Sequence, residues 1–433
     1  MKLTTDLSEG MAIVGIIGMG DMGKMYARRI SAAGWRVHAC DIPEKYDALN
    51  AEFAENKHVH IFSDGRSVAR SSDFILYSVE AEIIDKVASM YGPSTKQGAI
   101  VGGQTSCKEI EIAALRKHLP DDVHIVSCHS LHGPTIDPKG QALVLVKERA
   151  PQQSFHLVER ILSCLESKFV YLTAQEHDQI TADTQAVTHA AFLSMGTAWF
   201  ANKQFPWEID RYVGGIENVK CNIMLRIYSN RWHVYAGLAI LNSWAKSQIR
   251  QYADSVTELF KLMLAGKREE LEERVKTAGK AVFGSAGKER DLLLKDDVLD
   301  RFSLGQVPSE RMPNNHLSLL AMVDCWWKLG IVPYDHMICS TPPFRLWLGV
   351  TEYLFCQPEI LDDTIRTAID DNTFRSDDLE FTFAARGWSD CVSFGNFASY
   401  QDRFEKISTY FEPRFPAANK VGNEMIKTIL AKT

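Results

Sequence analysis

Short apolar runs alternate with amphipathic stretches throughout the first 172 residues of the chain. The apolar runs are rich in β-branched and aromatic residues, which is typical of buried strands. We expect strands at 11–17, 35–40, 58–62, 73–79, 98–102, 122–128, 141–146 and 168–172. Helical patterns lie among them near 22–33, 44–55, 81–91, 107–119 and 152–166. Strands that alternate with helices predict βαβ crossovers and an α/β domain with a mainly parallel, doubly wound sheet.

From about residue 173 the strand patterns stop and helical periodicity takes over. We expect helices at 175–203, 217–241, 244–266, 268–282, 315–329, 345–356, 358–369, 399–411 and 417–431. The stretch 303–315 is polar, contains two prolines and predicts a surface connection. The sequence therefore predicts two domains, a nucleotide-binding α/β domain over 1–172 and an all-helical domain over 173–433.

The composition, with 45% apolar and 24% charged residues, is that of a soluble globular protein. The net charge is −7 and no run of Lys or Arg could follow a phosphate backbone, so we expect neither nucleic acid nor an anionic membrane as a partner. The nine cysteines are scattered without a C-x-x-C pair, which favours a reducing compartment, and we predict no metal site. Residues 1–10 are polar, unlike a signal peptide, and no apolar run approaches the roughly 18 residues of a membrane span. We expect a cytoplasmic protein.

A glycine-rich turn follows the first expected strand and opens the first expected helix. It reads Gly18-Met19-Gly20-Asp21-Met22-Gly23, the G-x-G-x-x-G pattern in the context that dinucleotide binding requires. Gly18 permits the tight turn, Gly20 lets the backbone approach a pyrophosphate, and Gly23 allows close packing of helix on strand. The helix N-terminus adds amide donors and the positive end of its dipole. The alternative is a purely structural glycine turn. We predict a Rossmann-type cofactor site that contains Gly18, Gly20, Asp21, Met22 and Gly23.

The second expected strand ends at Asp41, where a carboxylate would bond a ribose hydroxyl. We therefore count Asp41 among the cofactor-binding residues. A carboxylate at this place favours NAD, because it would repel the 2′-phosphate of NADP. Lys45 and His38 are close enough in sequence to offset that charge. The residues alone leave the choice of cofactor open.

The loop Gly102-Gly103-Gln104-Thr105-Ser106-Cys107-Lys108 joins a strand to a helix. Loops at the carboxyl ends of parallel strands line the ligand crevice of a doubly wound sheet. Ser106 with Glu109 three residues later also forms a capping-box pattern. Capping and ligand contact are compatible, and both remain open for Ser106.

His129 stands at the end of another expected strand, in Ser127-Cys128-His129-Ser130-Leu131-His132-Gly133-Pro134. Gly133-Pro134 turns the chain so that the imidazole can face the crevice. With an ordinary pKa of about 6.5, a histidine here could take the proton from a hydroxyl group while its carbon loses a hydride. The alternative is a structural or surface histidine.

Two expected helices of the second domain carry polar stripes in apolar surroundings. Thr181, Gln185, Thr188 and His189 share one face, and a polar ligand or a helix–helix contact could satisfy them. The 217–241 pattern places a second stripe on one face, namely Asn222, Arg226, Ser229, Asn230 and His233. Arg231 lies about 140° from Arg226 around that helix. A dianionic ligand or salt bridges could pair these arginines.

Together these motifs resemble prephenate dehydrogenases, the TyrA-type family. The family's Ser-x-Lys loop is similar to Ser106-Cys107-Lys108, and its catalytic His motif to the segment that begins at His129, with Ser130 in place of the usual Pro. Its E-H-D motif is similar to Glu176-His177-Asp178, followed eleven residues after the Asp by a substrate-contacting His that corresponds to His189. Gln185 matches a Gln of some members. The substrate-binding Arg corresponds to Arg226 or Arg231.

The resemblance covers most of residues 11–260, and later runs such as YDHMICSTP resemble the fungal enzymes. It implies NADP as cofactor (NAD stays open), prephenate as substrate, a homodimer formed by the helical domain, and a role in tyrosine biosynthesis. It implies that His129 deprotonates the ring hydroxyl of prephenate while hydride leaves, with Ser106 and Lys108 in support. CO₂ is then lost and 4-hydroxyphenylpyruvate forms. Arg226 or Arg231, with His189 and Gln185, would contact the substrate.

Two alternatives from other classes remain at this point. A β-hydroxyacid dehydrogenase of the 6-phosphogluconate type also joins a Rossmann domain to a helical one, but it needs a catalytic Lys on the long helix. Here that helix offers no Lys before Lys203. A non-enzymatic redox sensor would bind the dinucleotide without needing His129 or the arginines.

Overall fold

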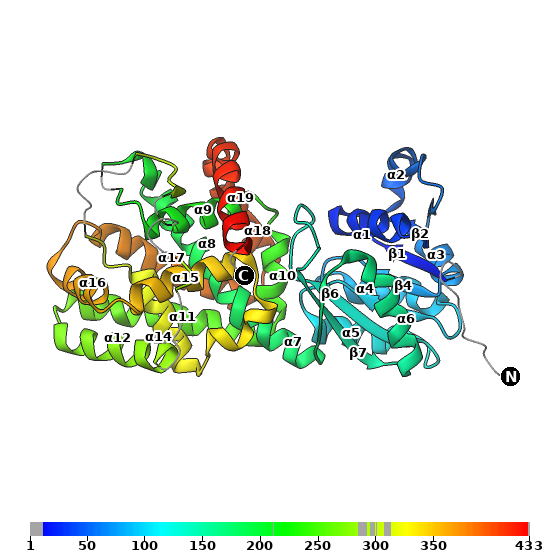
Figure 1. Cartoon of the computed structure of the whole chain (residues 1–433), viewed down its shortest axis with the longest axis horizontal. Helices are drawn as coiled ribbons and strands as arrows, with labels where there is room; N and C mark the ends of the chain where they lie inside the picture. The colour runs from blue at the N-terminus through cyan, green and yellow to red at the C-terminus, as the bar shows by residue number, and fades with distance from the viewer. Residues whose placement is uncertain are drawn as a thin grey trace. The chain divides into compact units, whose positions relative to one another are not determined.

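The computed structural model describes residues 12–210, 212–284, 292–294, 299, 301–306 and 313–431. The chain divides into two compact units, one up to Gln179 and one from Ile180 onward. Each unit is coloured continuously along the chain in Figure 1. The predicted domain boundary, between 172 and 173, lies a few residues before this division. The difference arises because most of helix α7 (Ala174–Thr181) is counted with the first unit.

The first unit is built on an eight-stranded sheet in the order β3-β2-β1-β4-β5-β6-β7-β8. The pairs are parallel except for β6 and β7, which run antiparallel. Its strands are β1 (Ile13–Ile17), β2 (Arg36–Cys40), β3 (Val59–Ile61), β4 (Phe74–Tyr77), β5 (Ile100–Gly103), β6 (His124–Ser130), β7 (Ala142–Arg149) and β8 (Lys168–Tyr171). Each overlaps a strand expected from sequence, and the doubly wound α/β class is confirmed.

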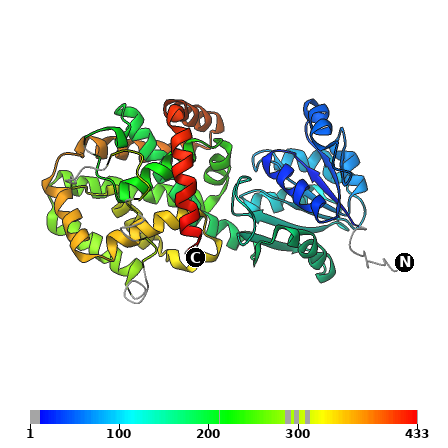
Figure 2. The ribbon, with the colours of Figure 1, turned by 45° about the horizontal axis from the view of Figure 1, so that its top comes forward.

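Helices lie on both sides of this sheet, as Figure 2 shows. They are α1 (Asp21–Ala32), α2 (Tyr46–Phe53), α3 (Gly65–Ser71), α4 (Ile84–Tyr91), α5 (Lys108–His118) and α6 (Gln152–Leu162). One apolar core packs α1 and α6 on the sheet, and a second packs α3, α4 and α5 on it. Helix α3 was not expected from sequence. It is short, and its stability depends on Asp64, whose side chain accepts from the backbone N–H groups of Arg66 and Ser67.

The second unit is helical in the residues that the structure describes. After α7 come a π-helical turn (Ala182–Ala186), α8 (Val187–Ala201), α9 (Ile216–Tyr228), α10 (His233–Leu241), α11 (Ser243–Leu264), α12 (Arg268–Phe283), α14 (Leu317–Leu329), α15 (Pro342–Phe355), α16 (Pro358–Asp370), α17 (Arg375–Phe394), α18 (Phe397–Phe411) and α19 (Phe415–Ala431). Helix α19, red in Figure 2, packs against α9 and α15. Helix α17 was missed in the sequence, because exposed Phe383 and mid-helix Gly387 blur its apolar periodicity.

The single helix predicted over 217–241 is wrong: α9 ends at Tyr228 and α10 begins at His233. Two side chains compete for the carbonyl oxygens of α9 at this break. Ser229 Oγ donates to the carbonyl oxygen of Arg226 at 2.9 Å, and Asn230 Nδ2 donates to the same oxygen at 3.2 Å. Side chains that take over backbone acceptors in this way end helices readily.

Two further predictions fall partly or wholly on residues that are not described. Within the predicted connection 303–315, the described residues 303–306 and 313–315 form neither helix nor strand, whereas 307–312 lie outside the described residues. The polar segment 1–10 also lies outside them. In the described ranges, no helix combines the length and the apolar character that crossing a membrane demands.

Candidate active site

The glycine loop between β1 and α1 has the geometry that its sequence predicts. Gly18 has φ +102°, and a Cβ on it would overlap the carbonyl oxygen of Ser78. A Cβ on Gly23 would overlap the carbonyl oxygen of Gly18, so the helix can approach the strand only with glycine there. A Cβ on Gly20 would meet nothing within 4 Å. Open space at the N-cap of α1, where Asp21 and Met22 begin the helix, suits the approach of a dinucleotide phosphate.

Asp41 turns its carboxylate back toward this loop. Its Oδ2 accepts from the backbone N–H of Met19 at 2.8 Å, and its Oδ1 accepts from the N–H of Ile42 at 2.7 Å. The Lys45 ammonium lies 3.2 Å from both oxygens. The carboxylate is thus partly neutralised and its lone pairs are engaged, which weakens the simple argument that it selects NAD.

His38 does not contribute to that neutralisation. Its Nδ1 bonds the hydroxyl of Ser71 at 2.7 Å, and its ring packs against His60 and Phe62. Burial lowers its pKa, with a smaller contribution from His60. Of the two cations that the sequence offered near Asp41, only Lys45 carries charge beside it.

Lys108 is fully buried at the start of α5. Its ammonium donates to Glu111 Oε1 at 2.8 Å, to Glu111 Oε2 at 2.9 Å and to Ser127 Oγ at 3.1 Å. The hydroxyl of Ser127 also bonds Glu111. Gly103 makes room for this cluster, because a Cβ there would overlap the Glu111 carboxylate. Since its ammonium is held by this ion pair, we assign Lys108 a supporting role beneath the strand ends.

The capping box predicted for Ser106 and Glu109 is wrong. Helix α5 begins at Lys108, and the residue that precedes it, Cys107, makes no side-chain cap. Asp178 caps the helix instead: its Oδ1 accepts from the backbone N–H of Lys108 at 2.7 Å and its Oδ2 from that of Glu109 at 2.9 Å. A carboxylate is a stronger cap than a hydroxyl because it also complements the helix dipole. Ser106 is left half-buried in the loop.

His129 begins a chain of hydrogen bonds that ends at the same Asp178. His129 Nδ1 lies 2.8 Å from His177 Nε2, and His177 Nδ1 lies 2.8 Å from Asp178 Oδ1. His177 and Asp178 are buried, whereas His129 is only partly buried. One residue therefore caps the helix that carries Lys108 and also supports the histidine pair.

The hydrogen-bond pattern fixes the protons on both rings when they are neutral. A carboxylate only accepts, so His177 Nδ1 carries hydrogen and donates to Asp178. His177 Nε2 is then an acceptor, and His129 Nδ1 must carry the hydrogen that it accepts. This leaves His129 Nε2 unprotonated, with its lone pair available to a hydroxyl proton.

The electrostatics favour this neutral state. Burial lowers the pKa of His129 well below its usual value, and the neighbouring His177 and Lys108 lower it further. Burial likewise lowers the pKa of His177 well below its usual value, followed by the effect of Lys108. Burial raises the pKa of Asp178, while the two backbone N–H groups of α5 act against that rise. A neutral imidazole with a free Nε2 is the form that a general base requires.

Ser130 occupies the position where the resemblance leads one to expect proline. Its backbone extends β6 and pairs with Leu143 of β7, and its hydroxyl bonds Tyr26 at 2.7 Å. Proline could not donate in such a ladder. The departure therefore lengthens the strand that carries His129 by one residue.

In the second unit, Gln185 and His189 contain buried polar atoms that have no hydrogen-bond partner among the described residues. These atoms are Gln185 Nε2 and His189 Nδ1. Burial lowers the pKa of His189 to about 3, so its ring is neutral. The ring stacks edge-on against Tyr235 at 4.7 Å between centroids. Such unsatisfied groups are costly unless a ligand or water completes them.

Arg226 is brought near the same tyrosine, but its surroundings differ from the predicted polar face. Arg226 Nη1 donates to Asn423 Oδ1 of α19 at 2.9 Å, and burial lowers its pKa, with Tyr235 acting in the opposite direction. Asn230 donates to the Tyr235 hydroxyl at 2.8 Å. The face that was to combine Arg226 with Asn230 and His233 does not exist, because α9 ends before them.

Asn222, also assigned to that face, is buried. Its Nδ2 donates to the carbonyl oxygens of Asn218 at 2.8 Å and Phe302 at 2.9 Å. Arg231 lies in the break between α9 and α10 and is exposed. Of the two arginines, the structure places only Arg226 beside Tyr235 and thus near His189.

Three residues of this arrangement were not chosen from sequence as catalytic or binding residues. His177 and Asp178 were seen only as part of a motif, and Tyr235 was not considered. The contacts that reveal the first two connect positions 48 and 70 residues apart along the chain. No local periodicity reports such contacts. Within the described ranges, no cluster of His, Cys, Asp and Glu could hold a metal ion.

Comparison with known proteins supports the interpretation of these sites. A family model described as "6-phosphogluconate dehydrogenase C-terminal domain" matches residues 186–431, and one described as "NADP oxidoreductase coenzyme F420-dependent" matches residues 13–101. Among solved structures, prephenate dehydrogenase from Aquifex aeolicus, in complex with hydroxyphenyl propionate and NAD⁺, superposes with a TM-score of 0.50 at 19% identity. That superposition covers 63% of this chain and 96% of the other, and shows the fold alone.

Two curated relatives cover nearly the whole chain. A probable NADP⁺ prephenate dehydrogenase of Schizosaccharomyces pombe is 57% identical, over 96% of this chain and 97% of the relative. The NADP⁺ prephenate dehydrogenase of Saccharomyces cerevisiae is 54% identical, over 97% of this chain and 94% of the relative. Identity at this level over nearly the full length confirms the resemblance seen in the motifs: the chain belongs to the prephenate dehydrogenase family.

Proposed function

We propose that the chain oxidises and decarboxylates prephenate to 4-hydroxyphenylpyruvate with NADP⁺, a step of tyrosine biosynthesis. Both curated fungal relatives are named for this activity and this cofactor. The structural observation that carries the proposal is the chain from Asp178 through His177 to His129. It presents an unprotonated Nε2 at the end of β6, where a ligand crevice is expected in a doubly wound sheet.

The residues of the first unit perform the acid–base part of the reaction. His129 Nε2 accepts the proton of the ring hydroxyl as the carbon that bears it becomes a carbonyl carbon. The imidazolium that forms is stabilised through His177 by the Asp178 carboxylate, as a buried carboxylate stabilises histidine in serine proteases. Lys108 and Glu111 hold the base of this loop rigid, and Ser106 faces the ligand from the preceding loop.

NADP⁺, bound at the loop from Gly18 to Gly23, supplies the hydride acceptor. The loop fits the cofactor because Gly20 has free space beside it and the N-terminus of α1 offers amide donors. Lys45 is the candidate contact for the 2′-phosphate, since Asp41 already shares its charge without saturating it. We keep Asp21 and Met22 as backbone contacts of the cofactor and Asp41 as the residue that orders the loop.

Arg226, His189 and Gln185 are the candidate substrate-binding residues of the second unit. Prephenate carries two carboxylates, and an arginine can hold a carboxylate with two parallel hydrogen bonds. The unsatisfied atoms of Gln185 and His189 give the ligand further polar partners. Oxidation to the dienone weakens the bond to the ring carboxylate, which leaves as CO₂ as the ring becomes aromatic.

We also propose that the protein is a cytoplasmic homodimer, with the dimer contact in the helical unit. The predicted reason was a surplus of tryptophan, but Trp207, Trp326 and Trp347 are buried inside the unit itself. A better reason is the exposed apolar surface of α17, where Phe383 is 61% and Phe394 82% exposed. Sedimentation that shows a monomer at micromolar concentration would contradict the dimer.

The alternative dehydrogenase of the 6-phosphogluconate type shares the helical domain but receives no support from the site residues. It would need a lysine on α8 that faces the substrate, yet Lys203 lies just beyond that helix, with its ammonium 3.7 Å from the centre of the Phe200 ring. The sensor hypothesis gives no reason for the histidine relay. Catalytic turnover separates it from an enzyme.

The experiment that tests the proposed function follows absorbance at 340 nm with prephenate and arogenate, each combined with NAD⁺ and NADP⁺. We expect the highest kcat/KM for prephenate with NADP⁺. A higher kcat/KM with NAD⁺ would contradict the cofactor assignment, and a preference for arogenate the substrate assignment.

A further inference from the structure

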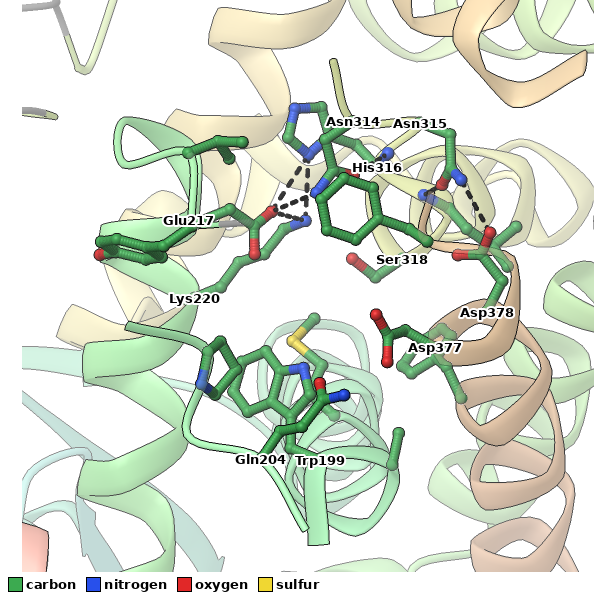
Figure 3. Close-up of a pocket in the computed structure, with 18 of the residues that line it drawn as sticks. Trp199, Gln204, Glu217, Lys220, Asn314, Asn315, His316, Ser318, Asp377 and Asp378 are labelled. Atoms are coloured by element: carbon green, nitrogen blue, oxygen red, sulfur yellow. Dashed lines mark hydrogen bonds and ion pairs between the residues drawn. The ribbon is translucent and has the colours of Figure 1, made fainter. Parts of the chain in front are cut away.

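A cavity in the helical unit, separate from the residues discussed so far, contains an unusual set of charges (Figure 3). It has about 710 Å³ of empty space, part of it open to solvent, which is within the usual range of about 300–1,000 Å³ for small-molecule sites. Neither Arg226 nor His189 lines it. Its walls come from α8, α9, α14 and α17, and from the segments that precede α9 and α14.

One wall of the cavity is electrically balanced. The buried Lys220 ammonium donates to Glu217 Oε1 at 2.7 Å and lies 3.1 Å from His316 Nδ1. Although burial opposes it, Lys220 lowers the pKa of Glu217 to about 2, so this pair is ionised and neutral overall. Burial lowers the pKa of His316, which therefore adds no charge near neutral pH.

The opposite wall is acidic. Asp377 and Asp378 lie across the cavity from Lys220, as Figure 3 shows. Asp378 is 8% exposed and accepts from Asn315 Nδ2 at 2.8 Å, and Asp377 accepts from Asn202 Nδ2 at 2.6 Å. Both of these donors are neutral amides. Among the described lining residues, Lys220 is the one Lys or Arg, and Glu217 already matches its charge.

The nearest further cation is Arg375, one turn before Asp378 on α17. It does not line the cavity, and its Nη2 donates to the carbonyl oxygens of Ala368 and Asp371. Burial raises the pKa of Asp378 to about 7 despite Asn315 and Arg375. A buried carboxylate in this state gains from a cation placed beside it.

Aromatic rings complete the cavity. Trp199 lies below the acidic wall in Figure 3, and Phe374 and Phe381 also line the space. Ring faces attract cations and bury apolar groups. The acidic wall would repel both prephenate and NADP⁺, which are anions, so the cavity is suited to neither.

We propose that this cavity binds a small organic cation, a protonated primary amine whose ammonium group lies between Asp377 and Asp378. Its apolar body packs on Trp199 and the neighbouring phenylalanines. Hydrogen-bond acceptors on the body would be met by Ser318 and by the amide groups of Asn314 and Gln204, which face the same space. The site is independent of the dehydrogenase reaction, and the proposal does not depend on the proposed function.

The test is a calorimetric titration of the full chain, saturated with NADP⁺, with 2-phenylethylamine. We expect one saturable site per chain and at least 10-fold weaker binding of the neutral analogue 2-phenylethanol. The Asp378→Asn variant keeps the hydrogen bond to Asn315 and should bind the amine at least 10-fold more weakly. Asp362→Asn, an exposed carboxylate on α16 that pairs with Lys276, is the matched control and should bind normally.

Two further measurements separate this site from adventitious binding. The affinity of the wild-type chain should rise between pH 6 and 8, as Asp378 ionises beside Asp377, Lys220 and Arg375, while that of Asp378→Asn stays flat. The anion 3-phenylpropionate should leave the amine titration unchanged, because it would occupy an anion site. Undiminished amine binding by Asp378→Asn, competition by the anion, or no binding at millimolar amine would each overturn the proposal. If Asp378→Asn does not fold, Asp377→Asn, at a partly exposed position, takes its place with the same expectation.

Discussion

Asp178 accepts the first backbone N–H groups of α5 and, with the same carboxylate, the Nδ1–H of His177. Folding of the loop that carries Ser106 and Lys108 is thereby coupled to the orientation of His129. The coupling explains why a His-Asp pair at the start of the helical segment matters to a histidine at the end of a distant strand. It also makes Asp178 a positioning residue, since it reaches the reacting atoms only through two imidazoles.

Asp178→Asn should lower kcat by about 10²-fold or more while the protein stays folded. An amide has a donor where the carboxylate has only acceptors. It would therefore reverse the tautomer of His177 and leave His129 Nε2 protonated. Loss of the charged cap should cost about 1 kcal/mol of stability.

The control for Asp178→Asn is Asp64→Asn, which alters the cap of α3 without touching a histidine. It should lower the melting temperature to a similar extent and leave kcat unchanged. If both variants kept normal kcat, the relay would have no catalytic role.

The pH dependence should show a base whose pKa is below 6.5. Burial lowers the pKa of His129, so the neutral form persists on the acid side of neutrality and kcat/KM should hold down to below pH 6.5. The same sign applies to stability. The unfolded chain binds protons on these histidines below about pH 6.5, so their contribution is complete above that pH and is lost as the pH falls toward the folded-state pKa. A rate profile with an inflection above pH 7 would contradict this.

Lys45→Ala should raise the KM for NADP⁺ by about 10-fold, because a charge-assisted contact with a phosphate is worth about 1.5–3 kcal/mol and Lys45 is half exposed. The KM for NAD⁺ should change less than about 2-fold by the same reasoning, since NAD⁺ lacks the 2′-phosphate. Lys96→Ala, which removes an ion pair with Asp73, serves as the matched control. Equal losses with both cofactors would instead point to a structural role of Lys45 beside Asp41.

Arg226→Ala should raise the KM for prephenate by about 10- to 150-fold and leave the KM for NADP⁺ nearly unchanged. Arg231→Ala, at the exposed position between α9 and α10, is the comparison and should have the smaller effect. A variant of Arg226 that is less stable but has a normal KM would mark the contact with Asn423 as purely structural. The substrate anchor would then be Arg231 or lie elsewhere.

Local patterns were sufficient to predict the strands, because each apolar run is buried by its own sheet. They also found His129, since the end of a strand can be read from the residues that follow it. They failed where a side chain acts across the fold. The cap of α5 comes from Asp178 rather than Ser106, and the break after Tyr228 depends on Ser229 and Asn230 binding a carbonyl oxygen.

The central claim is that His129 is the general base of prephenate oxidation, and the kcat of His129→Asn tests it most directly. Asparagine can still donate to His177 but has no basic nitrogen, so the relay geometry is preserved and proton transfer is lost. At saturating prephenate and NADP⁺, we expect kcat to fall by about 10²-fold or more, with little change in the dissociation constant of NADP⁺. His124→Asn, at the other end of β6 where it bonds Ser154, should retain normal kcat. Near-normal kcat in His129→Asn would contradict the assignment.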